Sequence, residues 1–199
     1  PAQRAMWWPL WKPAKLMRIS FAGELGWEVH TSFDDAKDAY DAVRDAGAVP
    51  FGMYALNSMR IEKGYRTWKG DLSTDYTLLE GGIERFIRFD KPQDFPGKAA
   101  LLAEKQQGVK KSFVTLIVDA GDADAPYMST LWNGDEVVGE TTSGDWGYRI
   151  NKSVALGMVR ADLAAPGTEL EVEIFGARHK AVVQKDEPLW DAANDRIRA

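Results

Sequence analysis

Apolar residues at helical spacing predict three helices in the first part of the chain. The longest covers residues 34–46, with acidic side chains in its first turn and Gly47 after its last apolar position. A shorter apolar stripe over residues 55–61 predicts a second helix, which Gly64 ends in a left-handed conformation. A third predicted helix, over residues 98–107, follows a segment rich in proline and glycine. All three predicted helices lie before about residue 110, so we expect the chain before this point to differ in structure from the chain after it.

Short runs of alternating residues predict β-strands on both sides of these helices. In the first part they cover residues 15–20 and 26–30, and the apolar content of residues 80–89 predicts a further, buried strand. The second part contains strand patterns alone, with a hairpin turn at Asn133-Gly134. Its predicted strands cover residues 112–118, 130–139, 154–160, 169–175 and 179–184. We therefore expect an α+β fold, with helices on one face of an antiparallel sheet, followed by a small all-β barrel.

Three segments between these elements carry candidate binding residues. Glu24 lies in a turn between Gly23 and Gly26, where the missing side chains let the backbone approach a flat ligand closely. Residues 65–76 interleave aromatic and charged side chains without periodicity, which is typical either of a ligand-binding loop or of a well-anchored surface loop. Residues 141–148 are expected to form another loop, which either borders the ligand or simply turns the chain.

Composition and charge exclude several classes of function. The net charge of -5 argues against a general nucleic-acid binder, which would carry a basic face. The chain has no cysteine and 2 histidines far apart in sequence, so we predict neither disulfides, nor a cysteine nucleophile, nor a metal site. It contains no apolar run long enough to span a membrane and no signal-peptide pattern, from which we expect a cytoplasmic location without membrane contact.

The opening residues 1–14 combine three tryptophans with three prolines, a mixture that fits neither a helix nor a regular strand. Trp7, Trp8 and Trp11 either form an apolar patch for a missing neighbour or pack over the core of the same domain. The chain does not begin with methionine, and we interpret it as a piece of a longer protein.

Three motifs together resemble one protein family. They are FAGELGWEVH at residues 21–30, GMYALNSMRIEKGYRTWKGDLS at residues 52–73 and VVGETTSGDWGYRINKSVALGMV at residues 137–159. Their order and spacing are similar to those of the glycine-cleavage aminomethyltransferase superfamily (the T-protein superfamily), in particular the folate-binding C-terminal region of dimethylglycine and sarcosine dehydrogenases. The resemblance covers most of the chain, from about residue 18 to residue 190.

The resemblance implies a partial, ferredoxin-like folate-binding subdomain followed by the family's C-terminal barrel. We place the folate-binding aminomethyltransferase-like domain, truncated at its N-terminus, at residues 1–110. The barrel domain then covers residues 111–199.

The resemblance also implies a folate-binding role for the Gly-Glu turn. In the superfamily, the glutamate of this motif binds the pterin, and this role transfers to Glu24, with Gly23 and Phe21 beside it. A carboxylate can accept both hydrogens of the pterin's exocyclic amine and adjacent ring N–H in a bidentate pair. Phe21 stands where the family frequently has tyrosine, so stacking is retained but a hydroxyl hydrogen bond is lost.

The second motif implies further contacts to the folate. Arg60 matches the second arginine of the family pattern, where it either contacts the ligand or pairs with a local carboxylate. Tyr65, Arg66 and Trp68 are expected to wall the same cavity. The family's first arginine is replaced by Leu56 here, which weakens any contact transferred from that position.

The implied function is a tetrahydrofolate-binding, one-carbon transfer module at the C-terminal end of an FAD-dependent dehydrogenase of the dimethylglycine or sarcosine type. The flavin would belong to an upstream domain of the same polypeptide, because no dinucleotide-binding G-x-G-x-x-G pattern occurs here. The family's catalytic aspartate lies upstream as well, so we assign no catalytic residue and expect this chain to be inactive alone. Two alternatives are a stand-alone folate-dependent aminomethyltransferase or demethylase relative and a docking module of the same fold without transfer chemistry.

Overall fold

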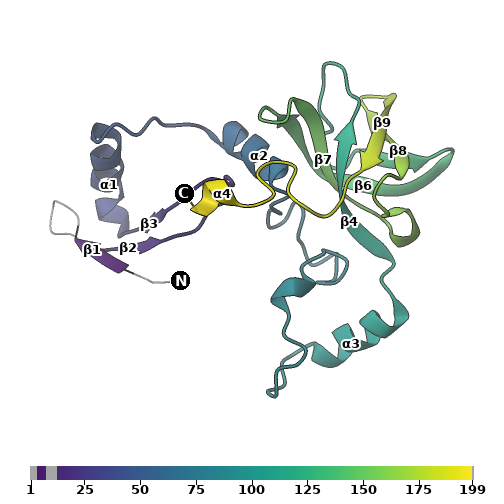
Figure 1. Ribbon diagram of the computed structural model, residues 1–199, viewed down its shortest axis with the longest axis horizontal. Helices are drawn as coiled ribbons and strands as arrows, with labels where there is room; N and C mark the ends of the chain where they lie inside the picture. The colour runs from purple at the N-terminus through teal and green to yellow at the C-terminus, as the bar shows by residue number, and fades with distance from the viewer. Residues whose placement is uncertain (1–3, 8–12, 199) are drawn as a thin grey trace.

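The protein is an elongated molecule with a small sheet at one end and a closed barrel at the other (Figure 1). A computed structural model describes residues 4–7 and 13–198. The sheet has three antiparallel strands in the order β1-β2-β3. Its strands are β1 (Arg4–Trp7), β2 (Pro13–Met17) and β3 (Glu28–His30). We expected no regular strand among the opening residues, and this expectation is wrong for residues 4–7. Trp8 and Trp11 lie outside the described residues, and the Trp7 side chain is not described.

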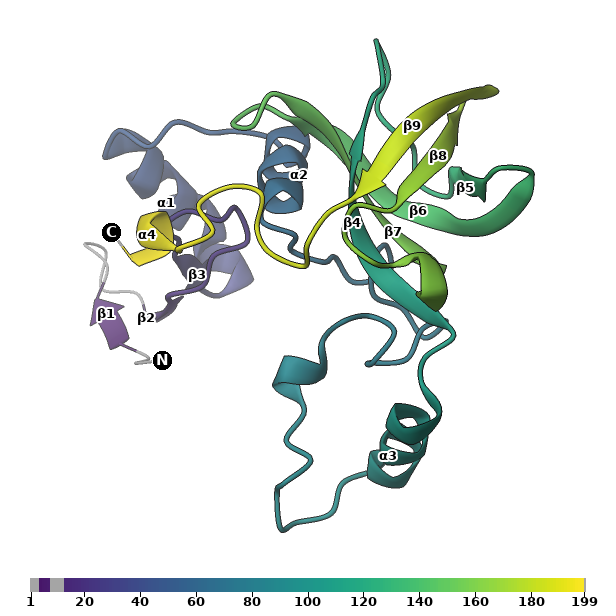
Figure 2. The same ribbon diagram turned by 45° about the vertical axis from the view of Figure 1, so that its right-hand side comes forward.

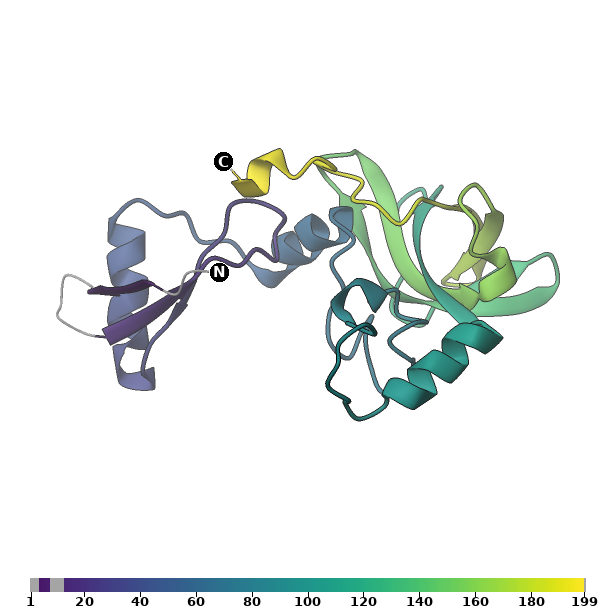
Figure 3. The ribbon, with the colours of Figure 1, turned by 60° about the horizontal axis from the view of Figure 1, so that its bottom comes forward.

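Helix α1 (Phe33–Asp45) lies beside this sheet and confirms the longest predicted helix (Figures 1 and 3). The Ser32 side chain caps it by accepting a hydrogen bond from the Asp35 backbone N–H at 3.2 Å. Of its apolar stripe, however, only Ala39 is buried, and Tyr40 and Val43 remain exposed. The small end of the molecule therefore presents apolar surface that a folded domain would normally cover.

The barrel is closed by six antiparallel strands in the order β4-β7-β6-β5-β8-β9. The strands are β4 (Lys111–Val118), β5 (Thr130–Asn133), β6 (Glu136–Gly147), β7 (Lys152–Arg160), β8 (Glu169–Ile174) and β9 (Ala177–Val183). All five predicted strand regions of this part are confirmed, including the hairpin at Asn133-Gly134. The expected architecture, an α+β part followed by a small barrel, is thus the one observed.

Strand β7 is buried on both faces because it belongs to two cores. Ala155 and Val159 point into the barrel interior. Leu156 and Met158 point outward and pack in a second core that includes Ile61 of helix α2 (Met53–Glu62). This second core attaches the helix to the barrel wall.

Helix α2 therefore packs on strands β6 and β7 of the barrel. We expected it to lie with the first helix on one face of the sheet, and this detail is wrong. The helix ends as predicted, since Gly64 has a φ of 65° two residues after Glu62. In the chain, α2 thus links the small end of the molecule to the barrel.

Two other sequence expectations are also wrong. Residues 80–89 form turns and a short 3-10 helix η1 (Glu84–Phe86), because Gly82 adopts a left-handed conformation with a φ of 64° and the backbone N–H of Phe86 bonds within the segment, to the Ile83 carbonyl oxygen. Phe86 is consequently exposed.

Residues 141–144 are not a loop but a buried part of β6, which carries a bulge at Thr141/Ser143. Tyr148 is exposed in the turn beyond this strand.

The remaining elements are α3 (Lys98–Gln107), which confirms the third predicted helix, a 3-10 helix η2 (Ala161–Leu163) and α4 (Asp195–Arg198). After β9 the chain leaves the barrel, passes α2 and places α4 near the small sheet (Figure 2). None of the described helices is both long enough and apolar enough to cross a lipid bilayer.

Replacing Gly144 by alanine tests how tightly β6 packs. A Cβ atom at this position would lie 2.0 Å from the Ala125 carbonyl oxygen, a backbone atom that cannot move alone. We expect Gly144→Ala to lower the free energy of unfolding by about 1–3 kcal/mol, as overpacking does. Gly121→Ala is the control, because no atom of the part of the chain that the structure describes lies within 4 Å of its Cβ position. Urea unfolding of both variants checks the prediction, and equal stabilities would contradict it.

Candidate functional site

The turn that carries Glu24 is shaped by packing within the protein. Gly23 has a φ of 74°, and a Cβ atom there would lie 2.1 Å from Cγ of Lys63. A Cβ atom on Gly26 would lie 2.5 Å from the Ile19 carbonyl oxygen. Glycine at residue 23 therefore lets the Lys63 side chain pass beneath the turn, a role that the sequence interpretation assigned to the approach of a ligand.

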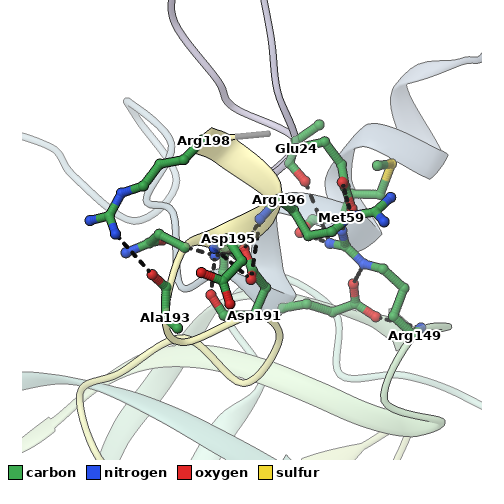
Figure 4. A network of polar contacts seen from close by, with 12 residues as sticks. Glu24, Met59, Arg149, Asp191, Ala193, Asp195, Arg196 and Arg198 are labelled. Atoms are coloured by element: carbon green, nitrogen blue, oxygen red, sulfur yellow. Dashed lines mark hydrogen bonds and ion pairs between the residues drawn. The ribbon is translucent and has the colours of Figure 1, made fainter.

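The Glu24 carboxylate lies between two arginines from distant parts of the chain (Figure 4). Arg149 Nη1 donates to one oxygen at 2.8 Å, and Arg196 Nε donates to the other at 2.9 Å. Partial burial alone would raise the pKa of the Glu24 carboxyl, but the hydrogen bonds and charges of Arg196 and Arg149 outweigh it and lower that pKa. Glu24 is consequently an ionised hydrogen-bond acceptor at neutral pH, and 26% of its side chain remains exposed.

Arg149 is held in place by the end of α2. Its backbone N–H and its Nε donate to the two carboxylate oxygens of Glu62, whose side chain is 1% exposed. Its Nη2 donates to the Met59 carbonyl oxygen at 2.7 Å, and its guanidinium lies over the Trp190 ring. A charge with this many partners keeps a single position.

Lys63 connects the same end of α2 to the C-terminal segment. Its ammonium group is fully buried and donates to the Asp191 carbonyl oxygen at 2.8 Å. It also contacts the Asp191 carboxylate at 3.3 Å and the Asn194 side-chain oxygen at 3.1 Å. Three acceptors satisfy the three hydrogens of the ammonium group, as a buried lysine requires.

Arg60 is buried in a network of its own, on the barrel side of α2. Its Nη1 lies 2.6 Å from the Asp71 carboxylate, and both side chains are almost fully buried. Asn57, Ser143 and the Tyr65 carbonyl oxygen accept its other hydrogen bonds. These contacts favour pairing with a local carboxylate, and the alternative contact with a ligand stays a prediction.

Asp71 fixes the loop that follows α2. Besides Arg60, it accepts hydrogen bonds from the Thr67 backbone N–H at 2.8 Å and from the hydroxyls of Thr142 and Ser143 on β6. Five donors therefore converge on one carboxylate when the Thr67 hydroxyl is included. The loop at residues 65–76 is therefore well anchored, which is one of the two structures that its sequence predicted.

Phe21 and Tyr65 meet at a cavity of about 240 Å³. Their rings are stacked, with centroids 6.4 Å apart. The cavity is lined by Ser20, Phe21, Gly64, Tyr65, Arg66, Leu72, Ile83, Arg85 and Phe86. Neither Glu24 nor Trp68 belongs to this lining, and Trp68 is 68% exposed. The structure therefore brings Phe21, Tyr65 and Arg66 together, with Glu24 on the adjoining turn.

Sequence reasoning missed the partners of Glu24. Arg149 lies within the motif at residues 137–159, which carries no feature that singles out this arginine, and Arg196 lies in a segment without periodicity. The burial of Lys63 could not be predicted from the sequence either, because a lysine at a helix end is normally exposed. Pairings between charges more than a hundred residues apart leave no local pattern in a single sequence.

Comparison with known proteins gives the chain a family context. The model of the GCVT N-terminal domain matches residues 11–91, and that of the glycine cleavage T-protein C-terminal barrel domain matches residues 111–191. The division at residue 110 itself stays a prediction.

Human mitochondrial dimethylglycine dehydrogenase is 40% identical over 181 residues, which are 89% of this chain and 21% of that protein. An aminomethyltransferase of Thermosynechococcus vestitus is 34% identical over 174 residues, 87% of this chain and 47% of that protein. Among solved structures, the glycine cleavage system aminomethyltransferase T from Bartonella henselae superposes with a TM-score of 0.80 at 24% identity, covering 90% of this chain and 50% of that one. The chain thus spans about a fifth of the dehydrogenase and about half of the transferase.

Gly23→Ala tests whether Lys63 needs the space beneath the turn. We expect a loss of about 1–3 kcal/mol in the free energy of unfolding, because a Cβ atom would overlap the lysine stem in a left-handed residue. Gly47→Ala is the matched control: its φ is 98°, yet none of the described residues has an atom within 4 Å of its Cβ position. Chemical denaturation of both variants separates steric overlap from backbone strain, and equal losses would contradict the role of Lys63.

The lowered pKa of Glu24 predicts a specific acid sensitivity. Because the folded-state pKa lies below the ordinary value, ionised Glu24 stabilises the fold above about pH 4.5, and this contribution disappears as the pH falls through the folded-state pKa. We expect Glu24→Gln to flatten the dependence of the unfolding free energy on pH in that window. Denaturation at a series of pH values measures it, with Glu28→Gln as an exposed control; parallel curves for all three proteins would refute the prediction.

Proposed function

Because this chain belongs to the aminomethyltransferase superfamily, we propose that it is a tetrahydrofolate-binding, one-carbon transfer module. In this proposal it forms the C-terminal part of an FAD-dependent protein related to dimethylglycine and sarcosine dehydrogenases. The upstream flavin domain oxidises an N-methyl amine, and the oxidised carbon passes to tetrahydrofolate held by this module.

The observation that carries the proposal is the state of Glu24. The carboxylate is ionised, partly exposed and placed on a fixed turn, so it can accept a parallel pair of N–H donors from a flat heterocycle. Arg149 keeps it oriented through Glu62. A preorganised acceptor of this kind suits the edge of a pterin.

The described residues fit one side of a folate molecule. Glu24 would hold the pterin edge, and the stacked rings of Phe21 and Tyr65 would lie against an aromatic part of the ligand. The cavity beside these rings, about 240 Å³, is below the usual range for ligand sites, so other parts of the protein would complete the site.

The chemistry of the transfer belongs to the cofactor. Bound tetrahydrofolate supplies the nitrogen atoms N5 and N10 that take up the one-carbon unit. This chain's residues bind and orient it and exclude water. We assign no acid of this chain to proton transfer, since the family's catalytic aspartate would lie upstream.

Exposed apolar residues at the start of α1 and at the start of α2 support an upstream neighbour. Phe33 and Tyr54 are more than nine-tenths exposed, and Phe51 and Met53, beside Tyr54 in the sequence, are mostly exposed. The human dehydrogenase relative is also about five times as long as its matched region. We propose that preceding domains of the same polypeptide, including the one with FAD, cover this surface.

Two alternatives are each supported by one observation. The match to 47% of an aminomethyltransferase supports a stand-alone relative that passes the carbon of another small substrate to folate. The complete pairing of both Glu24 oxygens and of Arg60 within the chain supports a docking module without transfer chemistry. The cytoplasmic location stays a prediction that the comparison does not favour, because the human dehydrogenase is mitochondrial by name.

Calorimetric titration with tetrahydrofolate tests the proposal on the full-length protein. We expect Glu24→Gln to weaken binding by roughly 10- to 100-fold, because the amide nitrogen faces a ligand donor and one charge-assisted bond is lost. Glu28→Gln, an exposed glutamate four residues away, should bind like the wild type. Absence of binding by the wild type would favour the docking module, and indifference to Glu24→Gln would remove the pterin contact.

A further inference from the structure

The C-terminal segment of residues 189–198 crosses the site and is attached at two levels (Figure 4). At its base, the backbone N–H groups of Leu189 and Trp190 donate to the Glu62 carbonyl oxygen, and Asp191 pairs with buried Lys63. At its tip, helix α4 makes two contacts with the small end of the molecule. Arg196 donates to Glu24, and Arg18 donates to the Ile197 carbonyl oxygen at 3.0 Å.

The base of the segment is the firmer of the two levels. Lys63 is fully buried, and the Asp191 carboxylate also accepts hydrogen bonds from the backbone N–H groups of Asp195 and Arg196. Asp191 and Asn194 both have positive φ, which bends the chain sharply before α4. The short helix is therefore connected to a fixed anchor through a tight turn.

The two arginines that hold Glu24 also differ in how firmly they are held. The Arg149 side chain is 17% exposed and has partners on Glu62 and Met59 as well as on Glu24. The Arg196 side chain is 63% exposed, and within the described part of the chain its guanidinium hydrogen-bonds to Glu24 alone. Arg149 is thus a permanent partner of the carboxylate, whereas Arg196 can leave at little cost.

We propose that Arg196 is an exchangeable counter-ion of Glu24 and that α4 is a gate over the ligand-binding carboxylate. A ligand with paired N–H donors takes over the oxygen that Arg196 occupies, while Arg149 keeps its own. Helix α4 then swings away from the turn about Asp191, which stays bound to Lys63. The inference rests on the proposed function, because it assumes that Glu24 binds such a ligand.

The gate explains how an occupied acceptor can also be a binding residue. Without a ligand, Arg196 donates to the carboxylate oxygen that Arg149 does not contact, so both oxygens of the partly buried carboxylate have a partner. One ligand N–H replaces the hydrogen bond of Arg196, and the second donates to the free lone pair of the oxygen that Arg149 contacts, so a molecule with two suitably spaced donors gains one hydrogen bond more than a molecule with a single donor. Arg196 is therefore a residue that determines specificity, and Lys63 is a positioning residue.

Arg196→Met in the full-length protein tests the exchange, with tetrahydrofolate as the probe. Removing the competing guanidinium should tighten binding roughly two- to fivefold, the size expected for an exposed ion pair. Arg198→Met is the matched control, because this arginine lies on the same helix and, among the residues that the structure describes, its side chain hydrogen-bonds only to the Ala193 carbonyl oxygen. Weaker or unchanged binding by Arg196→Met would overturn the gate.

Hydrogen exchange of the α4 amides gives a readout that a merely structural role would not produce. We expect the ligand to accelerate exchange at residues 195–198 of the wild type, and Arg196→Met to exchange rapidly without ligand. Slower exchange on ligand binding would show that the segment closes, and would overturn the gate. Lys63→Met should accelerate exchange from residue 191 onward, because it releases the anchor as well.

Failure of the gate and failure of the proposed function give different results. If Glu24→Gln weakens binding by roughly 10- to 100-fold while Arg196→Met also weakens it or leaves it unchanged, the pterin contact stands and the gate falls. If Glu24→Gln binds like the wild type, the proposed function fails and the gate falls with it. Tighter binding by Arg196→Met together with the expected weakening by Glu24→Gln supports both.

Discussion

Buried charges at the C-terminal end of α2 require partners, and these partners hold the molecule together. Arg60, Glu62 and Lys63 are each at most 3% exposed. An unpaired charge in such a place is strongly unfavourable, so each side chain reaches a different segment of opposite charge. Arg60 binds Asp71 and β6, Glu62 binds Arg149, and Lys63 binds the C-terminal segment. One turn of helix thereby fixes the loop, the barrel wall and the last helix around the Gly-Glu turn.

The fold was predictable where a local pattern has a local cause. Alternating apolar residues predicted the barrel strands, and Gly64 marked the end of α2, because side-chain periodicity and backbone conformation are properties of neighbouring residues. Residues 80–89 and 141–144 failed for the opposite reason. Whether a segment becomes a strand depends on its partners elsewhere in the chain: residues 141–144 pair with β7, whereas residues 80–89 form hydrogen bonds within their own turns. Likewise, the position of α2 on the barrel depends on the second core around Ile61, which joins distant segments.

The site was predictable only in part. The resemblance to the family selected Glu24, Phe21 and Tyr65, and the structure places the last two against each other. Arg60 was recognised with both of its possible roles. The electrostatic environment of Glu24 escaped prediction, because Arg149 and Arg196 lie 125 and 172 residues further along the chain. The need for glycine at residue 23 was identified, but its cause is the stem of Lys63.

The distance in sequence between Glu24 and Arg196 also bears on biosynthesis. On the ribosome, the acidic turn and α2 leave the exit tunnel long before the segment that completes them, at the usual pace of about 5–20 residues per second. During that interval Lys63 has no Asp191 to neutralise it. Lys63 therefore stays hydrated in the nascent chain, and its burial beneath the Gly-Glu turn is completed only after translation has reached the C-terminal segment.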